Sequence, residues 1–200
     1  NSITASAFAN GLATVAKTGA SAASYNVVML SNRTNIVVRE STGYGFAYRN
    51  GSNQLKALPI SDGVVVTPDN GDNTQNLRLT YEDTVTAGTP GSVTRTTALK
   101  YGTLALDSSG GSVTLDLGTN VLGSGATGEN GRGILITGEN AANSVTLTGT
   151  TPMITSGTSS GYSPFIYNYS KGDFNLGIPV DAGISLILGG TGMINLTGQV

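Results

Sequence analysis

The segment Pro68-Asp-Asn-Gly-Asp-Asn73 concentrates oxygen ligands around a glycine. Calcium loops use carboxylate and amide oxygens in this way, so Asp69, Asn70, Asp72 and Asn73 are candidate calcium ligands. The bidentate Glu that such loops need later is missing at the required offset. The Gly-Gly-x-Gly-x-Asp nonapeptide of calcium-binding β-rolls is absent as well. The alternative is a surface loop whose Asx side chains bind their own backbone, with no cofactor.

Four charged residues could form a second kind of site, a glycan-cleaving cleft on one wall of a β-helix. Asp107 and Asp116 lie in consecutive strand-like stretches, and Glu129 and Arg132 follow them. Pairing Asp107 or Asp116 with Arg132 would set a carboxylate beside a cation. The acids are scattered, however, and single carboxylates usually lie on the solvated side of strands. We therefore expect no enzyme and keep glycan binding or cleavage as an alternative.

Five of the tyrosines cluster in two short segments: Tyr44, Tyr48, Tyr162, Tyr167 and Tyr169. Exposed aromatic rings can stack on sugars or on partner strands. The alternative is burial at the edge of a small core with the hydroxyl groups in water. Surface glycans are therefore a candidate partner of the protein.

The composition excludes many function classes. The 200 residues contain no Cys, His or Trp, which rules out thiol nucleophiles, Cys/His zinc sites and every Ser-His-Asp triad within this sequence. Charged residues are 11% of the chain, with a net charge of −2, so no basic surface for nucleic acid or anionic lipid is expected. No apolar run approaches the roughly 18 residues of a membrane span.

Short strands are the elements that would position these side chains. The second half of the chain alternates apolar and polar residues between Gly, Asn, Asp and Pro, which is the pattern of strands and turns. We predict strands at Thr97–Leu106, Ser112–Leu117, Gly133–Thr137, Asn143–Thr148, Phe165–Tyr169, Asp173–Leu176, Gly183–Leu188 and Gly192–Leu196.

Paired strands recur at roughly twenty-residue intervals, as in residues 133–137 with 144–148 and 185–188 with 193–197. A repeat of this size indicates an all-β solenoid. Each coil of a solenoid buries its apolar face against the next coil, about 4.8 Å away. Two-residue Asn-Gly or Asp-Gly hairpin turns do not join these strands, which favours the solenoid over the alternative of a β-sandwich or jelly roll.

Two regions are expected along the chain. Residues 1–44 are predicted to form an N-terminal β segment or cap, and residues 45–200 the solenoid-like repeat region. Apolar residues among the alanines of residues 5–17 fall at helical spacing, which indicates a short amphipathic helix. Gly11 interrupts this pattern, so a first strand followed by a turn is the favoured interpretation and the helix is its alternative.

Three segments carry repeat motifs. The first is Gly45-Phe-Ala-Tyr-Arg-Asn-Gly-Ser-Asn-Gln-Leu-Lys-Ala-Leu58, the second is Thr103-Leu-Ala-Leu-Asp-Ser-Ser-Gly-Gly-Ser-Val-Thr-Leu-Asp-Leu-Gly118 with Gly131-Arg-Gly-Ile-Leu-Ile-Thr-Gly138, and the third is Ser185-Leu-Ile-Leu-Gly-Gly-Thr-Gly-Met-Ile-Asn-Leu-Thr-Gly198. They resemble the secreted bacterial proteins with autotransporter-associated β-strand repeats, which are similar to autotransporter passenger domains. The first segment departs from the family motif in the spacing of Arg49 to Asn53.

The resemblance implies a right-handed parallel β-helix, export to the cell surface, and a role as a stalk, adhesin or matrix fibre. It implies no catalytic residues. We expect a non-enzymatic extracellular structural protein, exported with its signal peptide removed, that binds copies of itself. A chain ending in mid-pattern at Val200 is expected to associate head to tail into fibres. The alternative is a coat, capsid or surface-layer subunit.

Overall fold

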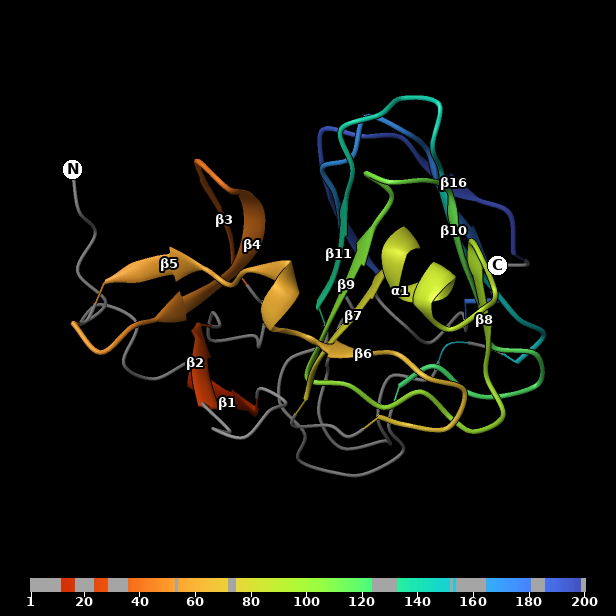
Figure 1. Ribbon diagram of the computed structural model, residues 1–200, viewed down its shortest axis with the longest axis horizontal. Coiled ribbons are helices and arrows are strands. Elements are labelled where there is room, and N and C mark those ends of the chain that lie inside the picture. The colour runs from red at the N-terminus through yellow and green to blue at the C-terminus, as the bar shows by residue number, and fades with distance from the viewer. Residues whose placement is uncertain are drawn as a thin grey trace.

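The computed structural model is mostly β, and its strands form three sheets within the residues it describes (Figure 1). The described residues are 36–52, 54–71, 75–123, 133–151, 153, 165–180 and 186–198, together with the backbone of residues 12–16 and 24–28.

The first sheet is antiparallel and lies in the N-terminal part of the chain. Its strands run in the order β1-β2-β4-β3, and β5 also pairs with β4. They are β1 Leu12–Ala16, β2 Ser24–Val28, β3 Val37–Glu40, β4 Gly43–Arg49 and β5 Leu55–Ala57. Gly45 allows β4 to pass the segment after β5, because a Cβ there would overlap the backbone of Leu58.

Strand β1 decides between the strand and the helix interpretations within residues 12–16. Its residues pair with β2 in antiparallel register, with Leu12 opposite Val28. An isolated helix of this length is marginal in water. Pairing with β2 supplies cross-strand hydrogen bonds, and the β-branched Thr14 and Val15 favour a strand. The favoured strand interpretation is thus confirmed at residues 12–16, whereas residues 5–11 and Lys17 lie outside the described residues.

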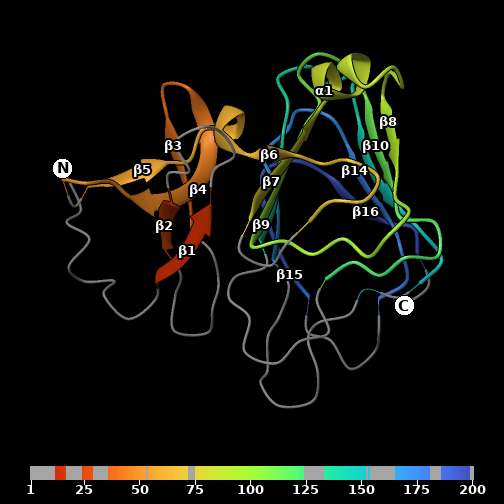
Figure 2. The same cartoon turned by 60° about the horizontal axis from the view of Figure 1, so that its bottom comes forward.

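From β6 onward the described strands pair in parallel, and the chain alternates between two sheets (Figures 1 and 2). The inner sheet, which faces the antiparallel sheet, has the order β15-β13-β11-β9-β7-β6, and the outer sheet has the order β16-β14-β12-β10-β8. The inner strands are β6 Val64–Val65, β7 Asn76–Thr80, β9 Thr103–Asp107, β11 Gly133–Thr137, β13 Phe165–Asn168 and β15 Ile187–Gly190. The outer strands are β8 Ser92–Thr94, β10 Val113–Asp116, β12 Val145–Thr148, β14 Phe174–Gly177 and β16 Ile194–Leu196.

Two short helical elements complete this arrangement. The 3-10 helix η2 (Ile60–Asp62) precedes β6, and helix α1 (Tyr81–Thr86) links β7 to β8. No helix is predicted at the position of α1. A capping box begins it, because the Thr80 side chain accepts from the amide of Asp83 and the Asp83 side chain accepts from the amide of Thr80. Arg78 adds an ion pair to Asp83 at 3.0 Å.

Apolar ladders fill the space between the two parallel sheets. Each ladder contains one residue from every coil, so that neighbouring side chains stack along the direction of strand pairing. The inner sheet contributes the ladder Leu77, Leu104, Ile134, Ile166 and Leu188. The outer sheet contributes the ladder Val93, Leu115, Leu147, Leu176 and Leu196. The buried members of both ladders belong to one core cluster.

Strands β9 and β11 of the inner sheet are buried on both faces, whereas β10 and β12 of the outer sheet are buried on one. Leu135 of β11 points away from the ladders and packs with Phe46 and Leu58 from the antiparallel sheet. This explains two sequence patterns. The run Gly133-Ile-Leu-Ile-Thr137 is almost continuously apolar because both of its faces are covered. The run Val145-Thr-Leu-Thr148 alternates because its threonines face outward.

A third row of parallel contacts follows the outer strands. Leu99 forms a parallel bridge with Leu122, and Met153 forms one with Val180. Each bridge includes a backbone hydrogen bond of 2.9 Å, from the amide of Leu99 to Val121 and from the amide of Met153 to Pro179. The chain thus returns from the outer to the inner sheet through a segment that again lies against the previous coil. The arrangement is consistent with a β-solenoid.

Each predicted stretch from Thr97 to Leu196 overlaps an observed strand, although the strand within Thr97–Leu106 begins only at Thr103 and residues 183–185 lie outside the described residues. The repeat interval is less regular than expected. Asp107 and Thr137 of successive coils are 30 residues apart, whereas Asn175 and Asn195 are 20 apart. The corners between strands differ in length while the strands keep their register.

The boundary between sheet types lies later than residues 44 and 45. Antiparallel pairing continues to Ala57 at the end of β5, and parallel pairing begins at Val64 in β6. Strand β4 crosses the expected boundary because it is central to the antiparallel sheet. The parallel pairing from β6 to β16 is also unlike a β-sandwich or jelly roll, whose strands are antiparallel.

Candidate functional site

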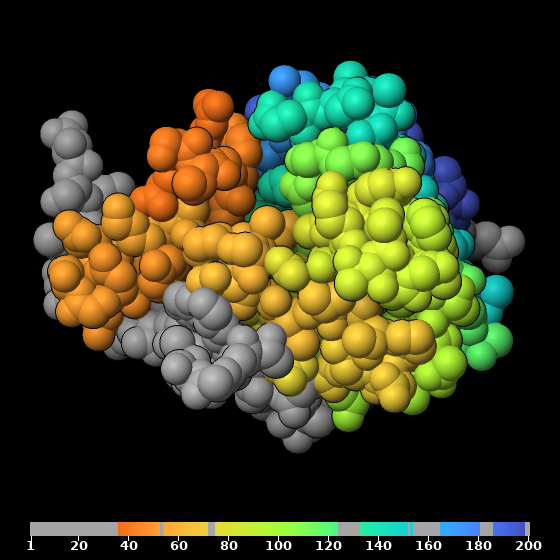
Figure 3. Space-filling model, in the orientation of Figure 1, coloured from red at the N-terminus to blue at the C-terminus, as the bar shows by residue number. Residues whose placement is uncertain are grey.

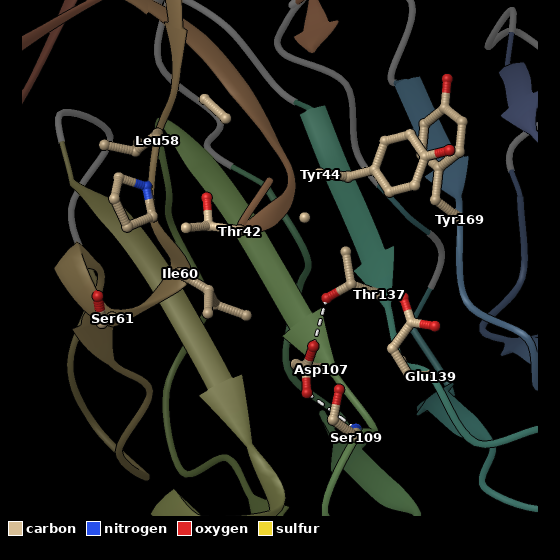
Figure 4. A pocket seen from close by; sticks show the side chains of 14 residues that line it. Thr42, Tyr44, Leu58, Ile60, Ser61, Asp107, Ser109, Thr137, Glu139 and Tyr169 are labelled. Carbon is tan, nitrogen blue, oxygen red and sulfur yellow. Dashed lines mark hydrogen bonds between the residues drawn. The ribbon is translucent and has the colours of Figure 1, made fainter. Parts of the chain in front are cut away.

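A pocket of about 300 Å³ lies where the antiparallel sheet meets the inner sheet (Figure 4). One side comes from the turn between β3 and β4 and from the segment that follows β5. The other side comes from the ends of β9 and β11 and the residue after β13. Figure 3 shows the segment from β3 to β5, in orange, beside the parallel stack. The lining residues are Thr42–Tyr44, Ala57–Ser61, Asp107, Ser109, Thr137–Glu139 and Tyr169.

Asp107 is a carboxylate held in a fixed position at this pocket. One oxygen, Oδ1, accepts from the amide of Ser109 at 2.8 Å. The other, Oδ2, accepts from the hydroxyl of Thr137 at 2.5 Å. Each carboxylate oxygen can accept a second hydrogen bond. The side chain is thus oriented by the protein and still has capacity for a ligand.

Asp116 makes the same kind of turn on the outer sheet, where its Oδ1 accepts from the amide of Gly118 at 2.8 Å. Asp107 and Asp116 therefore end strands of different sheets, and the structure does not bring them together. Glu129 and Arg132 lie outside the described residues. The glycan-cleaving cleft stays a prediction, and its two described acids, Asp107 and Asp116, lie on different sheets.

Glu139 is the second carboxylate of the pocket and is exposed. It forms an ion pair with Lys171 at 2.9 Å. The hydrogen bond and the charge of Lys171 lower the pKa of Glu139. A general acid in glycoside hydrolysis needs the opposite shift, toward a higher pKa. Glu139 is thus suited to remain a carboxylate.

The tyrosines join the two layers at the edge of this pocket. The rings of Tyr44 and Tyr169 stack with centroids 4.0 Å apart, and the guanidinium of Arg39 lies 5.4 Å from the centre of the Tyr44 ring. Tyr167 continues the row, 6.4 Å from Tyr169. Burial raises the pKa of Tyr167 and of Tyr169. Tyr162 lies outside the described residues.

These contacts place the rings at the edge of a small core, which is the alternative that the sequence left open. Tyr48, Tyr167 and Tyr169 pack against the cluster of Phe46, Leu58 and Leu135. One face of Tyr44 and one face of Tyr169 are already used by their mutual stacking. Stacking of these two rings on a sugar stays a prediction.

Asp69 and Asn70 lie in the segment that follows β6. The positively charged guanidinium of Arg95 binds this segment. This side chain is 2% exposed. It donates to the carbonyl oxygens of Thr67 and Asn70 and, at 3.3 Å, to Asn70 Oδ1. The Asn70 side chain also accepts from the amide of Thr67 at 2.9 Å and donates to the carbonyl of Val65 at 2.7 Å.

Arg95 bears on the calcium hypothesis. The oxygens of Asn70 are engaged by a positive charge, which would repel a second cation placed on them. Asp72 and Asn73 lie outside the described residues, so calcium binding there stays a prediction. The described residues contain no group of three or more acidic side chains that could hold a metal. Burial lowers the pKa of Arg95, and the nearby charge of Asp69 raises it.

The segment Val64–Gly71 covers one end of the parallel stack. Val64 and Val66 are buried in the main core, and the amide of Val66 donates to Arg78 at 2.8 Å. Farther along, the carbonyl of Pro68 accepts from the amide of Thr96 at 2.7 Å. This segment therefore acts as a cap on the first full coil, and Arg95 fastens it.

The opposite end of the stack, formed by β15 and β16, exposes apolar side chains. Leu188 is 43% exposed and Leu196 is 46% exposed, although both continue ladders that are buried in the preceding coils. Ile187 and Met193 of the same coil are 37% and 62% exposed. Of the large exposed hydrophobic residues in the described part of the chain, Val85 alone lies elsewhere. We call this surface the open coil.

Comparisons with family models, curated proteins and solved structures return no match to this chain. A separate finding concerns membranes: among the described residues, no helix has the length and apolar character needed to cross one.

Proposed function

We propose that this chain is a non-enzymatic structural module, a right-handed parallel β-solenoid of an exported fibre or stalk, that associates with copies of itself through the open coil. The carrying observation is the contrast between the two ends of the stack. Val64–Gly71 covers one end, whereas the other end leaves Leu188 and Leu196 exposed at the ends of otherwise buried ladders.

The closure of each coil is supported by the third row of parallel bridges. Leu99 with Leu122 and Met153 with Val180 lie between the outer strand of one coil and the inner strand of the next. Three rows of parallel pairing are what a three-sided solenoid requires. The right hand follows from the general rule that a connection between parallel strands of one sheet is right-handed in about 98% of cases.

The resemblance to autotransporter passenger domains supports export and a role at the cell surface. Its motifs coincide with structural repeats: residues 45–58 cover the hairpin of β4 and β5, and residues 103–118 cover one inner strand and the following outer strand. Between these strands, the Gly and Asn residues of the motifs lie at corners, and the apolar residues within the strands form the ladders.

The open coil has the properties of an association surface. Among the described strands, β15 and β16 each pair with one neighbour in their sheet. The backbone N–H and C=O groups along the other edge of each strand can pair with another chain. Unpaired edges next to apolar side chains pair readily with another chain. Addition of a coil would bury Leu188 and Leu196 as the preceding ladder residues are buried, at roughly 25 cal/mol per Å² of apolar surface.

Introducing a charge into the apolar surface tests this proposal. Leu188→Lys places a charge at the end of a ladder, and Val85→Lys is the matched control on α1, where Val85 is similarly exposed at 48%. Light scattering coupled to size-exclusion chromatography gives the mass of each. We expect oligomers for the wild type and for Val85→Lys and monomers for Leu188→Lys. A wild type that stays monomeric at high concentration contradicts the proposal, as does equal association of the two variants.

A further inference from the structure

We propose that the pocket between the antiparallel sheet and the inner sheet binds a single neutral hexose or N-acetylhexosamine unit of a glycan. The pocket lies on the flank of the stack and shares no residue with the open coil. The inference is therefore independent of self-association and adds a ligand site to the proposed structural role.

The size of the pocket sets the size of the ligand. Its volume of about 300 Å³ is at the lower limit of pockets that bind small molecules. One six-membered sugar ring fits such a volume, whereas an oligosaccharide would extend out of it. Thr42, in the β3–β4 turn that lines the pocket, is exposed, so the neighbouring units of a glycan could remain in water.

The polar groups of the pocket suit sugar hydroxyls. Asp107 retains acceptor capacity on both oxygens while Ser109 and Thr137 hold it in place. The hydroxyls of Thr42, Ser61 and Ser109 also line the pocket and make no hydrogen bond to the protein within its described part. A fixed carboxylate with several free hydroxyls offers both acceptors and donors to a polyol.

An apolar surface lies across the pocket from the stacked tyrosines. Figure 4 shows Leu58 and Ile60 on one side, with Tyr44 and Tyr169 on the other and Asp107 below them. Sugar rings have apolar C–H faces as well as hydroxyl edges, and pockets for them combine apolar walls with a few polar groups. Although Tyr44 and Tyr169 stack on each other, both still line the pocket, and the edges of their rings form part of its wall.

The charged groups of the pocket argue against a bound metal ion. Glu139 is already paired with Lys171, and the other carboxylate, Asp107, accepts hydrogen bonds from the neutral Ser109 and Thr137. A bound cation would need several anionic or carbonyl ligands around it. The same arrangement supports binding rather than cleavage, because cleavage needs two carboxylates across the bond, one with a raised pKa.

Nuclear magnetic resonance of the ¹⁵N-labelled chain tests the site. The probes are the methyl glycosides of glucose, galactose, mannose and N-acetylglucosamine, each titrated to about 50 mM, since a ligand of this size is expected to bind with a Kd of about 1–10 mM. We expect at least one probe to shift the amide signals of Ser109 and Thr137. Lysine methyl ester serves as the cationic comparison.

Two pairs of variants locate the binding. Asp107→Asn removes the charge and can still accept from the Ser109 amide, so we expect affinity to fall about tenfold. Asp116→Asn changes the equivalent turn of the outer sheet and should leave affinity unchanged. Thr42→Arg fills the mouth of the pocket and should abolish binding, whereas Ser41→Arg, next to it in the exposed turn, should not.

Three results would overturn the inference. The first is the absence of shifts with all four glycosides. The second is equal affinity of Asp107→Asn and Asp116→Asn together with unchanged binding by Thr42→Arg. The third is a shift of the pocket amides by lysine methyl ester alone, which would assign the pocket to a cationic ligand.

Discussion

Replacing Arg95 with Met should release the cap from the first coil of the stack. The guanidinium of Arg95 is buried and donates to the carbonyls of Thr67 and Asn70, to Thr97 Oγ1 at 3.1 Å and to the carbonyl of Ala98 at 3.3 Å. Methionine keeps much of the packing volume but satisfies none of these oxygens.

The magnitude follows from the number of orphaned acceptors. Hydrogen bonds to a charged group contribute about 1.5–3 kcal/mol each, and buried acceptors without partners add a cost of their own. Water entering the loop would offset part of the loss. We therefore expect Arg95→Met to lower the free energy of unfolding by about 3 kcal/mol, a large part of the 5–15 kcal/mol typical of a domain.

Urea unfolding followed by far-ultraviolet circular dichroism measures this change. Lys171→Met is the control, because Lys171 and Glu139 form an exposed pair whose loss should cost about 0.5 kcal/mol or less. Arg95→Lys keeps a charge without the planar fork and should fall between the two. A difference of less than about 1 kcal/mol between Arg95→Met and Lys171→Met would refute the assignment of Arg95 as the fastener.

Three further predictions concern the glycines, the tyrosines and the loop of residues 68–73. Gly45→Ala should destabilise the protein by about 1–3 kcal/mol, because its Cβ meets the backbone of a neighbouring segment, whereas Gly51→Ala, in open space, should change stability little in the same urea assay. Burial raises the pKa of Tyr167 and Tyr169, so stability should be fully present below about pH 10, the unfolded value, and decline as pH rises through the higher folded pKa; a midpoint of thermal unfolding that rises with pH there would contradict this. Calcium at about 1 mM should leave the thermal midpoint unchanged because Arg95 occupies the loop, and an increase would instead support the calcium site.

The strands of the parallel stack could be predicted because their pattern is local. In Val145-Thr-Leu-Thr148, for example, alternation alone separates the buried from the outward residues. Helix α1 left a usable signal, the Thr80 and Asp83 capping box, although its six residues are too few for a periodic pattern. At residues 12–16 the strand, rather than the alternative of a helix, is found because pairing with β2 outweighs the helix propensity of the alanines.

The candidate sites depended on pairings that sequence spacing does not reveal. Arg95 reaches oxygens of residues 25 and 28 positions earlier, and nothing near Arg95 in the sequence marks it as buried. Asp107 was recognised as a chemically useful carboxylate, but its partner Thr137 lies 30 residues away in the next coil. The pocket itself exists because the antiparallel sheet packs against the inner sheet, a contact between segments far apart in the chain.

The central claim, association through the open coil, is tested most directly by amide hydrogen exchange measured at low and at high protein concentration. The account predicts that the amides of β15 and β16 become more protected as concentration rises, while those of β3, in the antiparallel sheet on the flank of the stack, do not change. Protection that appears at β3 instead, or none at β15 and β16 in a sample shown to be oligomeric, would contradict it.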